Sequence, residues 1–201
     1  MRSISTEPPW VVVGARGDDD YLQATLDLAA TITVPDRILV VVPATDSAPA
    51  ELIALAHALE RDPLGRIVFL PTDPYVADGT LRDALRAASV GPARPRVSLL
   101  GATRIATGPI TAFWDLVRAH LPVHAAWLER YIDAIGTPDE QPALAAAYAA
   151  MPHASFDRDL LAKADAIAVI PSAAATRTRS PSYSGCSTNQ WNARYGDAAA
   201  V

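Results

Sequence analysis

The stretch VVVGARGDDDYLQATL, residues 11–26, sets the fold expected for this chain. It opens with an unbroken apolar run, passes through a turn with two glycines and continues as an amphipathic segment. This order is typical of a buried strand, a turn and a helix. Because the apolar run has no polar alternation, it predicts a strand buried on both faces, as in a parallel sheet covered by helices.

The pattern of this first strand and helix recurs along most of the chain. We expect strands at residues 10–13, 37–42, 66–70, 96–100 and 166–170. We expect helices at residues 20–31, 49–60, 79–90, 109–120, 122–135, 139–150 and 157–163. Strands that alternate with helices are typical of a mainly parallel sheet. The sequence therefore predicts a three-layer, Rossmann-like α/β fold with helices on both faces of the sheet.

The composition changes abruptly after Pro171. Residues 172–201 are rich in Ser, Thr, Arg and Ala and contain almost no aliphatic side chains. Such a segment cannot bury enough apolar surface to offset the entropy lost on ordering. We therefore expect one domain over residues 1–171 and a loosely ordered tail over residues 172–201.

Bulk composition narrows the classes of function. The chain has 201 residues, a formal net charge of −5 and no clustered basic run, which argues against nucleic acid as a partner. No segment approaches the roughly 20 apolar residues of a membrane helix, and no apolar core follows Arg2 as in a secretory signal. We expect a cytoplasmic protein whose partners are small molecules. Self-association into a homo-oligomer stays open.

Asp73 has a clear potential role in the chemistry of a site. It lies three residues past Leu70, where the strand expected at 66–70 ends. Open parallel sheets bind ligands beyond the carboxyl ends of their strands, and a carboxylate there can bind Mg²⁺ that bridges a phosphate. An aspartate before a proline, here Pro74, also starts turns, so position alone leaves both interpretations open.

Other reactive side chains give weaker signals. His120 and His124 are four residues apart, but Pro122 breaks the helix that would align their rings on a zinc ion. The single cysteine, Cys186, lies in the expected tail, which argues against a catalytic thiol. The apolar stripe around Phe113 has helical spacing, and we interpret it as core packing.

Three stretches resemble the sugar-1-phosphate nucleotidyltransferases, in particular the bacterial mannose-1-phosphate guanylyltransferases. SAP at 47–49, which opens a helix, matches the end of the family motif G-T-A-P. LPTD at 70–73 matches the family motif L-P-S-D, whose aspartate binds magnesium. SFDRDLLAK at 155–163 follows the family pattern S-I-D-Y-x-V-M-E-K. The resemblance covers most of residues 10–171.

The resemblance implies an α/β fold of the nucleotide-diphospho-sugar transferase type and transfer of a nucleotidyl group to a hexose 1-phosphate. In its specific form this is GMP transfer from GTP to mannose 1-phosphate, with release of pyrophosphate. It implies Mg²⁺ as cofactor, with Asp73 as its ligand and as the catalytic residue. The implied nucleotide-binding residues are Gly14, Arg16, Gly17, Ser47 and Pro71, and the implied substrate-binding residues are Gly108, Asp157 and Lys163.

The chain departs from the family pattern in its first turn. The long glycine-rich loop of the family is reduced to GARGDDD, and three aspartates beside a triphosphate would repel it. We interpret Asp18, Asp19 and Asp20 as turn and N-cap residues of the next helix, where negative charge is favourable. The family segment that carries the second metal-binding aspartate is also absent after AIAVIP at 166–171.

These gaps leave an alternative open: a shortened, non-catalytic relative that binds a nucleotide or a protein partner. A dehydrogenase-type domain is disfavoured because the first turn lacks G-x-G-x-x-G.

Overall fold

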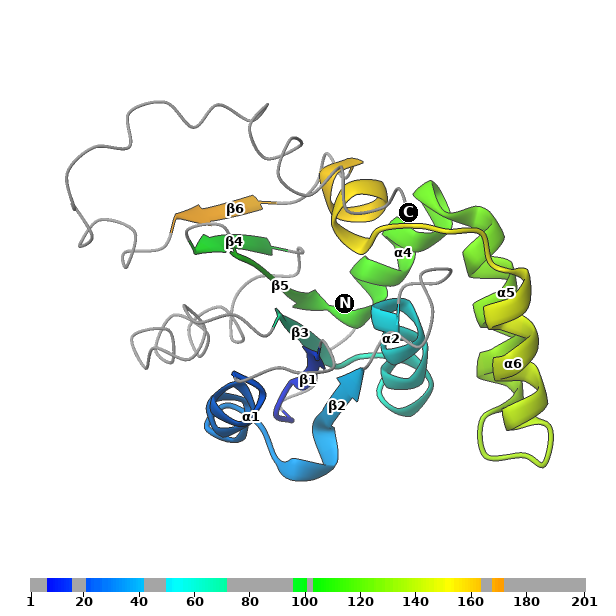
Figure 1. The fold of residues 1–201 in the computed structure, drawn as a ribbon, viewed down its shortest axis with the longest axis horizontal. Helices are drawn as coiled ribbons and strands as arrows, with labels where there is room; N and C mark the ends of the chain where they lie inside the picture. Colours follow the sequence, from blue (N-terminus) through cyan, green and yellow to red (C-terminus); the bar gives the residue numbers. More distant parts are fainter. Residues whose placement is uncertain are drawn as a thin grey trace.

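A computed structural model describes residues 7–15, 21–41, 50–71, 96–100, 103–163 and 168–171. Six strands of this part form one sheet in the order β2-β1-β3-β5-β4-β6 (Figure 1). The strands are β1 Trp10–Gly14, β2 Ile38–Val41, β3 Arg66–Pro71, β4 Arg96–Leu100, β5 Thr103–Pro109 and β6 Ala168–Pro171. Five of them lie where the sequence predicts strands.

The sheet is mainly parallel, as expected, with one reversed strand. β1 pairs in parallel with both β2 and β3, and β4 pairs in parallel with β6. β5 runs antiparallel to both of its neighbours, β3 and β4. β5 is not among the strands predicted from the sequence, because its residues TRIATGP combine threonines and a glycine and show no apolar run. Its position between two strands nevertheless buries Ile105, Ala106 and Thr107 almost completely.

The helices agree with the expected pattern wherever the structure describes them. They are α1 Leu22–Ala30, α2 Ala50–Arg61, α4 Ile110–His120, α5 Pro122–Ala134 and α6 Glu140–Ala150, followed by the π-helix η3 Phe156–Leu160 and the 3-10 turn η4 Leu161–Lys163. The helix expected at 79–90 and the expected tail lie outside the described residues. Among the described helices, each is too short or too polar to span a bilayer.

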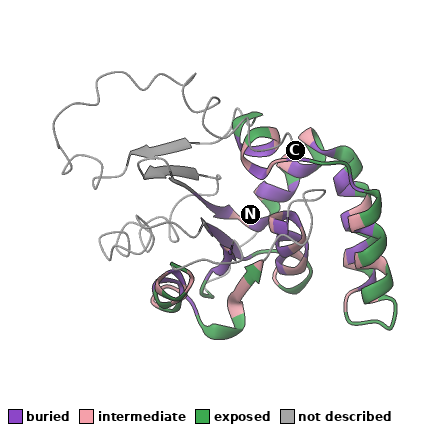
Figure 2. Ribbon diagram, viewed as in Figure 1, coloured by how far each residue is buried: buried purple, intermediate pink, exposed green. Residues whose placement is uncertain are grey.

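Helices cover both faces of the sheet, which confirms the three-layer prediction. One face of the central strands packs against α1 through buried side chains of Val11, Val13, Leu28, Ala29, Val68, Leu70 and Ile105. The other face contributes Val12, Ile67 and Phe69 to a larger core that includes α2, α4 and α5. Figure 2 shows this burial along the strands and on the inward sides of the helices. Alternate residues of β1 and β3 therefore enter different cores.

Three phenylalanines pack against one another in the larger core, with Phe69 in contact with the other two. The ring of Phe69, on β3, lies edge-on to Phe113 of α4 with centroids 5.3 Å apart. Phe69 also packs against Phe156 of η3, with ring centroids 4.5 Å apart. Phe113 is fully buried, and Trp114 and Val117 beside it are also buried. The apolar stripe predicted from the sequence is therefore core packing, as expected.

The ends of the helices confirm one sequence interpretation and correct another. α4 ends at His120 and α5 begins at Pro122, so the proline does break the helix between the two histidines. Asp18, Asp19 and Asp20 do not occupy the N-cap position of the first helix, and they lie outside the described residues. The N-cap of α1 is Tyr21, which makes no side-chain capping bond. Its carbonyl accepts from the Thr25 amide and hydroxyl, each at 2.9 Å, and this fixes the first turn instead.

A reciprocal cap starts η3. The Ser155 hydroxyl accepts from the backbone N–H of Arg158 at 3.3 Å, and Asp159 accepts from the backbone N–H of Ser155 at 2.8 Å. Two otherwise unpaired amides are thereby satisfied. The Ser155 amide is also the main cause that holds the pKa of Asp159 below its ordinary value of 3.8, with Arg158 and Lys163 adding to the effect.

Replacement of Phe113 tests the importance of the aromatic cluster. Phe113→Ala is expected to lower the free energy of unfolding by about 3 to 5 kcal/mol, because it leaves a cavity in a fully packed core. Urea denaturation followed by circular dichroism measures the change. Val123→Ala is the control, since Val123 is 52% exposed and its loss should cost less than about 0.5 kcal/mol. Equal effects of the two substitutions would contradict the packing described.

Replacement of Asp159 tests the reciprocal cap. Asp159→Ala is expected to lower the free energy of unfolding by about 1 kcal/mol at neutral pH, as capping residues do. A carboxylate whose pKa is lowered by folding stabilises the fold at pH values above its ordinary pKa. This contribution is lost as the pH falls through the lowered pKa. The wild-type chain and the variant should therefore converge in stability below pH 3.8. Asp139→Ala is the matched control, because Asp139 occupies an N-cap without a side-chain capping bond. A difference that persists at low pH would contradict this account.

Candidate functional site

The carboxyl ends of β1 and β3 bring two of the predicted site residues together. Gly14, the last residue of β1, is the register partner of Pro71, the last residue of β3. On its other side, Gly14 pairs with Val41, where β2 ends. Two of the predicted nucleotide-binding residues, Gly14 and Pro71, are therefore neighbours across one strand pair. We refer to the ends of β1, β2 and β3 as the carboxyl edge.

The other candidates for this edge follow directly along the chain. Arg16 and Gly17 come two and three residues after Gly14, and Asp73 comes two residues after Pro71. Ser47 precedes the first residue of α2 by three positions. All four lie outside the described residues, so their assignments stay predictions.

Glu51 adds a carboxylate to the carboxyl edge that the sequence analysis did not assign to a site. It lies in the first turn of α2, and its Oε1 atom is 3.9 Å from where a Cβ on Gly14 would be. Both residues are partly exposed to solvent. From the sequence, a glutamate in a first helical turn is fully explained by the helix dipole. Only its position two residues after the SAP motif could have indicated a site.

Tyr148 of α6 lies within electrostatic range of Glu51. Burial raises the pKa of the Tyr148 hydroxyl, and the negative charge of Glu51 raises it further. The tyrosine therefore stays neutral at physiological pH. The surroundings of Glu51 thus include the uncharged side chain of Tyr148 and the backbone of Gly14.

Gly108, a predicted substrate-binding residue, is not at the carboxyl edge. It lies within β5, where its register partner is Ile67. Ile67 and Pro71 are four residues apart on β3, and this separates them by about 13 Å along the strand. The antiparallel direction of β5 therefore carries Gly108 toward the amino ends of the parallel strands.

The predicted substrate-binding residues Asp157 and Lys163 belong to the helical layer. Asp157 is a partly exposed residue of η3, and Lys163 ends η4. The Lys163 ammonium lies 3.7 Å from a carboxylate oxygen of Asp159, one turn earlier. The structure thus pairs Lys163 with Asp159, beside the cap of η3.

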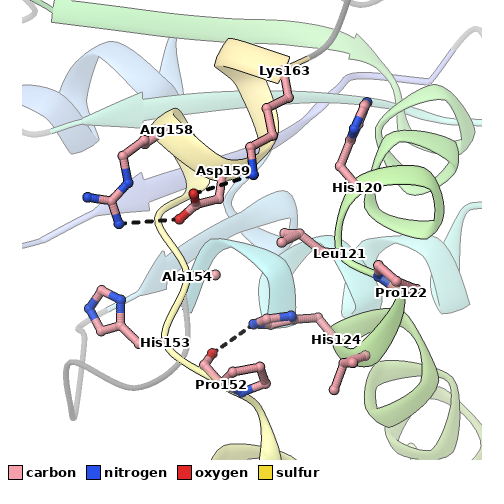
Figure 3. A pocket seen from close by; sticks show the side chains of 11 residues that line it. His120, Leu121, Pro122, His124, Pro152, His153, Ala154, Arg158, Asp159 and Lys163 are labelled. Atoms are coloured by element: carbon pink, nitrogen blue, oxygen red, sulfur yellow. Dashed lines mark hydrogen bonds and ion pairs between the residues drawn. The ribbon is translucent and has the colours of Figure 1, made fainter.

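A shallow groove of about 390 Å³ opens between this segment and the junction of α4 and α5 (Figure 3). Its charged side chains are those of Arg158, Asp159 and Lys163, and Asp159 pairs with both cations. On the opposite wall, the Nε2 atom of His124 lies 2.9 Å from the carbonyl oxygen of Pro152. Burial is the main cause that lowers the pKa of His124, so this imidazole is neutral at pH 7.

The groove is distinct from the carboxyl edge. The residues that line the groove come from the α4–α5 junction and from the segment after α6, and none of them belongs to the ends of β1, β2 or β3. Within the described residues, no group of three or more His, Cys, Asp or Glu could hold a metal ion. In the groove, Asp159 pairs with Arg158 and Lys163, and His124 contacts a backbone carbonyl. At the carboxyl edge, Gly14 and Pro71 are the described residues that are predicted to bind a nucleotide.

Comparison with known proteins identifies the fold. No protein-family model matches the chain, and no curated protein matches it. Among solved structures, the chain is similar to the crystal structure of mannose-1-phosphate geranyltransferase from Thermus thermophilus, with a TM-score of 0.58 and 20% sequence identity. The match covers 82% of this chain and 74% of that one. The chain therefore has the α/β fold of that protein, and the α/β fold is what the sequence resemblance implied.

Proposed function

We propose that the chain binds a nucleoside triphosphate at the carboxyl edge and transfers its nucleotidyl group to a sugar 1-phosphate. In the specific form of the proposal, GTP and mannose 1-phosphate are the substrates and GDP-mannose and pyrophosphate are the products. The observation that carries the proposal is the pairing of Gly14 with Pro71 at the ends of adjacent parallel strands. Ligands of open α/β sheets bind at such strand ends.

Two independent lines support the proposal. The sequence resembles the sugar-1-phosphate nucleotidyltransferases in three stretches, and two of these flank the carboxyl edge in the chain. The overall fold is that of a protein described as a mannose-1-phosphate geranyltransferase. The choice of GTP and mannose rests on the sequence resemblance.

The proposed reaction needs no covalent nucleophile. An oxygen of the sugar 1-phosphate attacks the α-phosphorus of GTP, the bond from that phosphorus to the bridging oxygen breaks, and pyrophosphate leaves. The protein contributes position and neutralisation of charge. Because Gly14 has no side chain, its backbone allows close approach of a nucleotide. Asp73 is the proposed catalytic carboxylate, and Mg²⁺ held there would neutralise charge on the phosphates.

Asp73→Ala is the direct test. The purified chain is incubated with GTP, mannose 1-phosphate and MgCl₂, and release of pyrophosphate is measured with a coupled assay. The wild-type chain is expected to release pyrophosphate, and the variant should be slower by about 100-fold or more, because it loses the charge that holds the metal. Asp115→Ala is the control, since Asp115 is exposed on α4 and should leave the rate unchanged.

Each outcome separates the proposal from its alternative. Release of pyrophosphate that depends on Asp73 supports nucleotidyl transfer. No release with any tested combination of nucleoside triphosphate and sugar 1-phosphate would sink the enzymatic proposal and leave a shortened, non-catalytic binding protein. An active Asp73→Ala variant would show that the metal is held elsewhere.

A further inference from the structure

We propose that the groove between the α4–α5 junction and η3–η4 binds a small phosphate monoester, with Arg158 and Lys163 as the groups that hold its phosphate. This site is separate from the carboxyl edge, so it does not depend on the proposed nucleotidyl transfer.

The groove is cationic, although the chain as a whole has a formal net charge of −5. Among the described residues that line it, Asp159 is the one carboxylate, and it faces two cations, Arg158 and Lys163. The imidazoles of His120 and His153 add further hydrogen-bonding groups. Figure 3 shows Arg158 and Lys163 on one side of the groove and His120 on the other. A hollow lined by one sign of charge attracts ligands of the opposite sign.

Asp159 positions the two cations without engaging all of their donors. Its Oδ2 atom accepts from the Ser155 amide at 2.8 Å, whereas the contacts to Arg158 and Lys163 are longer, at 3.4 Å and 3.7 Å. A guanidinium has five N–H donors and an ammonium has three, so a single carboxylate leaves most of them available. The side chains of Arg158 and Lys163 are 69% and 54% exposed, so a ligand in the groove has access to these donors.

The donors and the size of the groove together favour a phosphate ester. The phosphate of a monoester carries about 1.5 to 2 negative charges at pH 7 and three acceptor oxygens, which match an arginine and a lysine side by side. The groove, at about 390 Å³, lies within the range of small-molecule sites and is larger than a lone phosphate ion needs. Leu121, Val123 and Ala154 add apolar surface to its lining. The body of the ligand is therefore compact and uncharged, and it packs against this surface.

Nuclear magnetic resonance of the histidine rings locates the ligand. Three of the four histidines, His120, His124 and His153, line the groove, whereas His57 lies on α2. The full chain is labelled at histidine and titrated with glycerol 3-phosphate at constant pH and constant ionic strength. The ring signals of His120 and His153 are expected to move and to reach saturation, while those of His57 stay in place.

Removal of either cation tests the assignment. Arg158→Gln and Lys163→Gln should each raise the Kd for glycerol 3-phosphate by about 10-fold, because each removes a charge-assisted hydrogen bond. Arg130→Gln is the matched control, since Arg130 is an exposed arginine of α5 that does not line the groove, and the Kd should stay unchanged. The titration of the wild-type chain needs no variant and stands even if a substituted chain fails to fold.

The outcomes separate the site from its alternatives. Saturating shifts that weaken in both groove variants support the site. Inorganic phosphate that binds as tightly as glycerol 3-phosphate would overturn the assignment to an ester. Shifts that sodium chloride reproduces, or equal shifts at His57, would overturn the site itself, because they report screening of charge or non-specific contact. Binding in the groove by a chain that releases no pyrophosphate would support this site and overturn nucleotidyl transfer.

Discussion

The burial of β1 and β3 on both faces is the constraint on which the rest of the structure depends. Alternate residues of these strands enter two different cores, with α1 on one side and α2 and α4 on the other. On both faces, the buried side chains of these strands pack against helices. Polar chemistry on this sheet is therefore confined to its edges, and the parallel pairing of the two strands makes their ends coincide.

At the carboxyl edge, that constraint brings together residues that are far apart in the chain. Gly14 and Pro71 meet because β1 and β3 end in register. Glu51 reaches the same place because α2 begins there, with its first turn beside the end of β1. A helix N-terminus, a glycine and a carboxylate form a polar border to an apolar sheet.

The groove in the helical layer illustrates how similar residue types serve stability as well. Asp159 closes the cap of η3 and pairs with Arg158 and Lys163, and His124 is oriented by the carbonyl of Pro152. Phe156, in the same segment, anchors this layer on Phe69 of the sheet. Part of the third stretch that resembles the nucleotidyltransferases is thus explained by packing and capping. In this region, the residues that resemble the family serve the fold at least as much as they would serve the binding of a ligand.

Local sequence determined the helices and five of the strands, because apolar periodicity and prolines act within a few residues. It predicted the break at Pro122 and the core role of Phe113 for the same reason. Only the tertiary structure placed β5, since its residues are strand-like only between two neighbours that bury them. The tertiary structure likewise places Gly108 away from Gly14 and places Glu51 at the carboxyl edge. Register and strand direction decide which distant residues meet, and neither is encoded in any short stretch of chain.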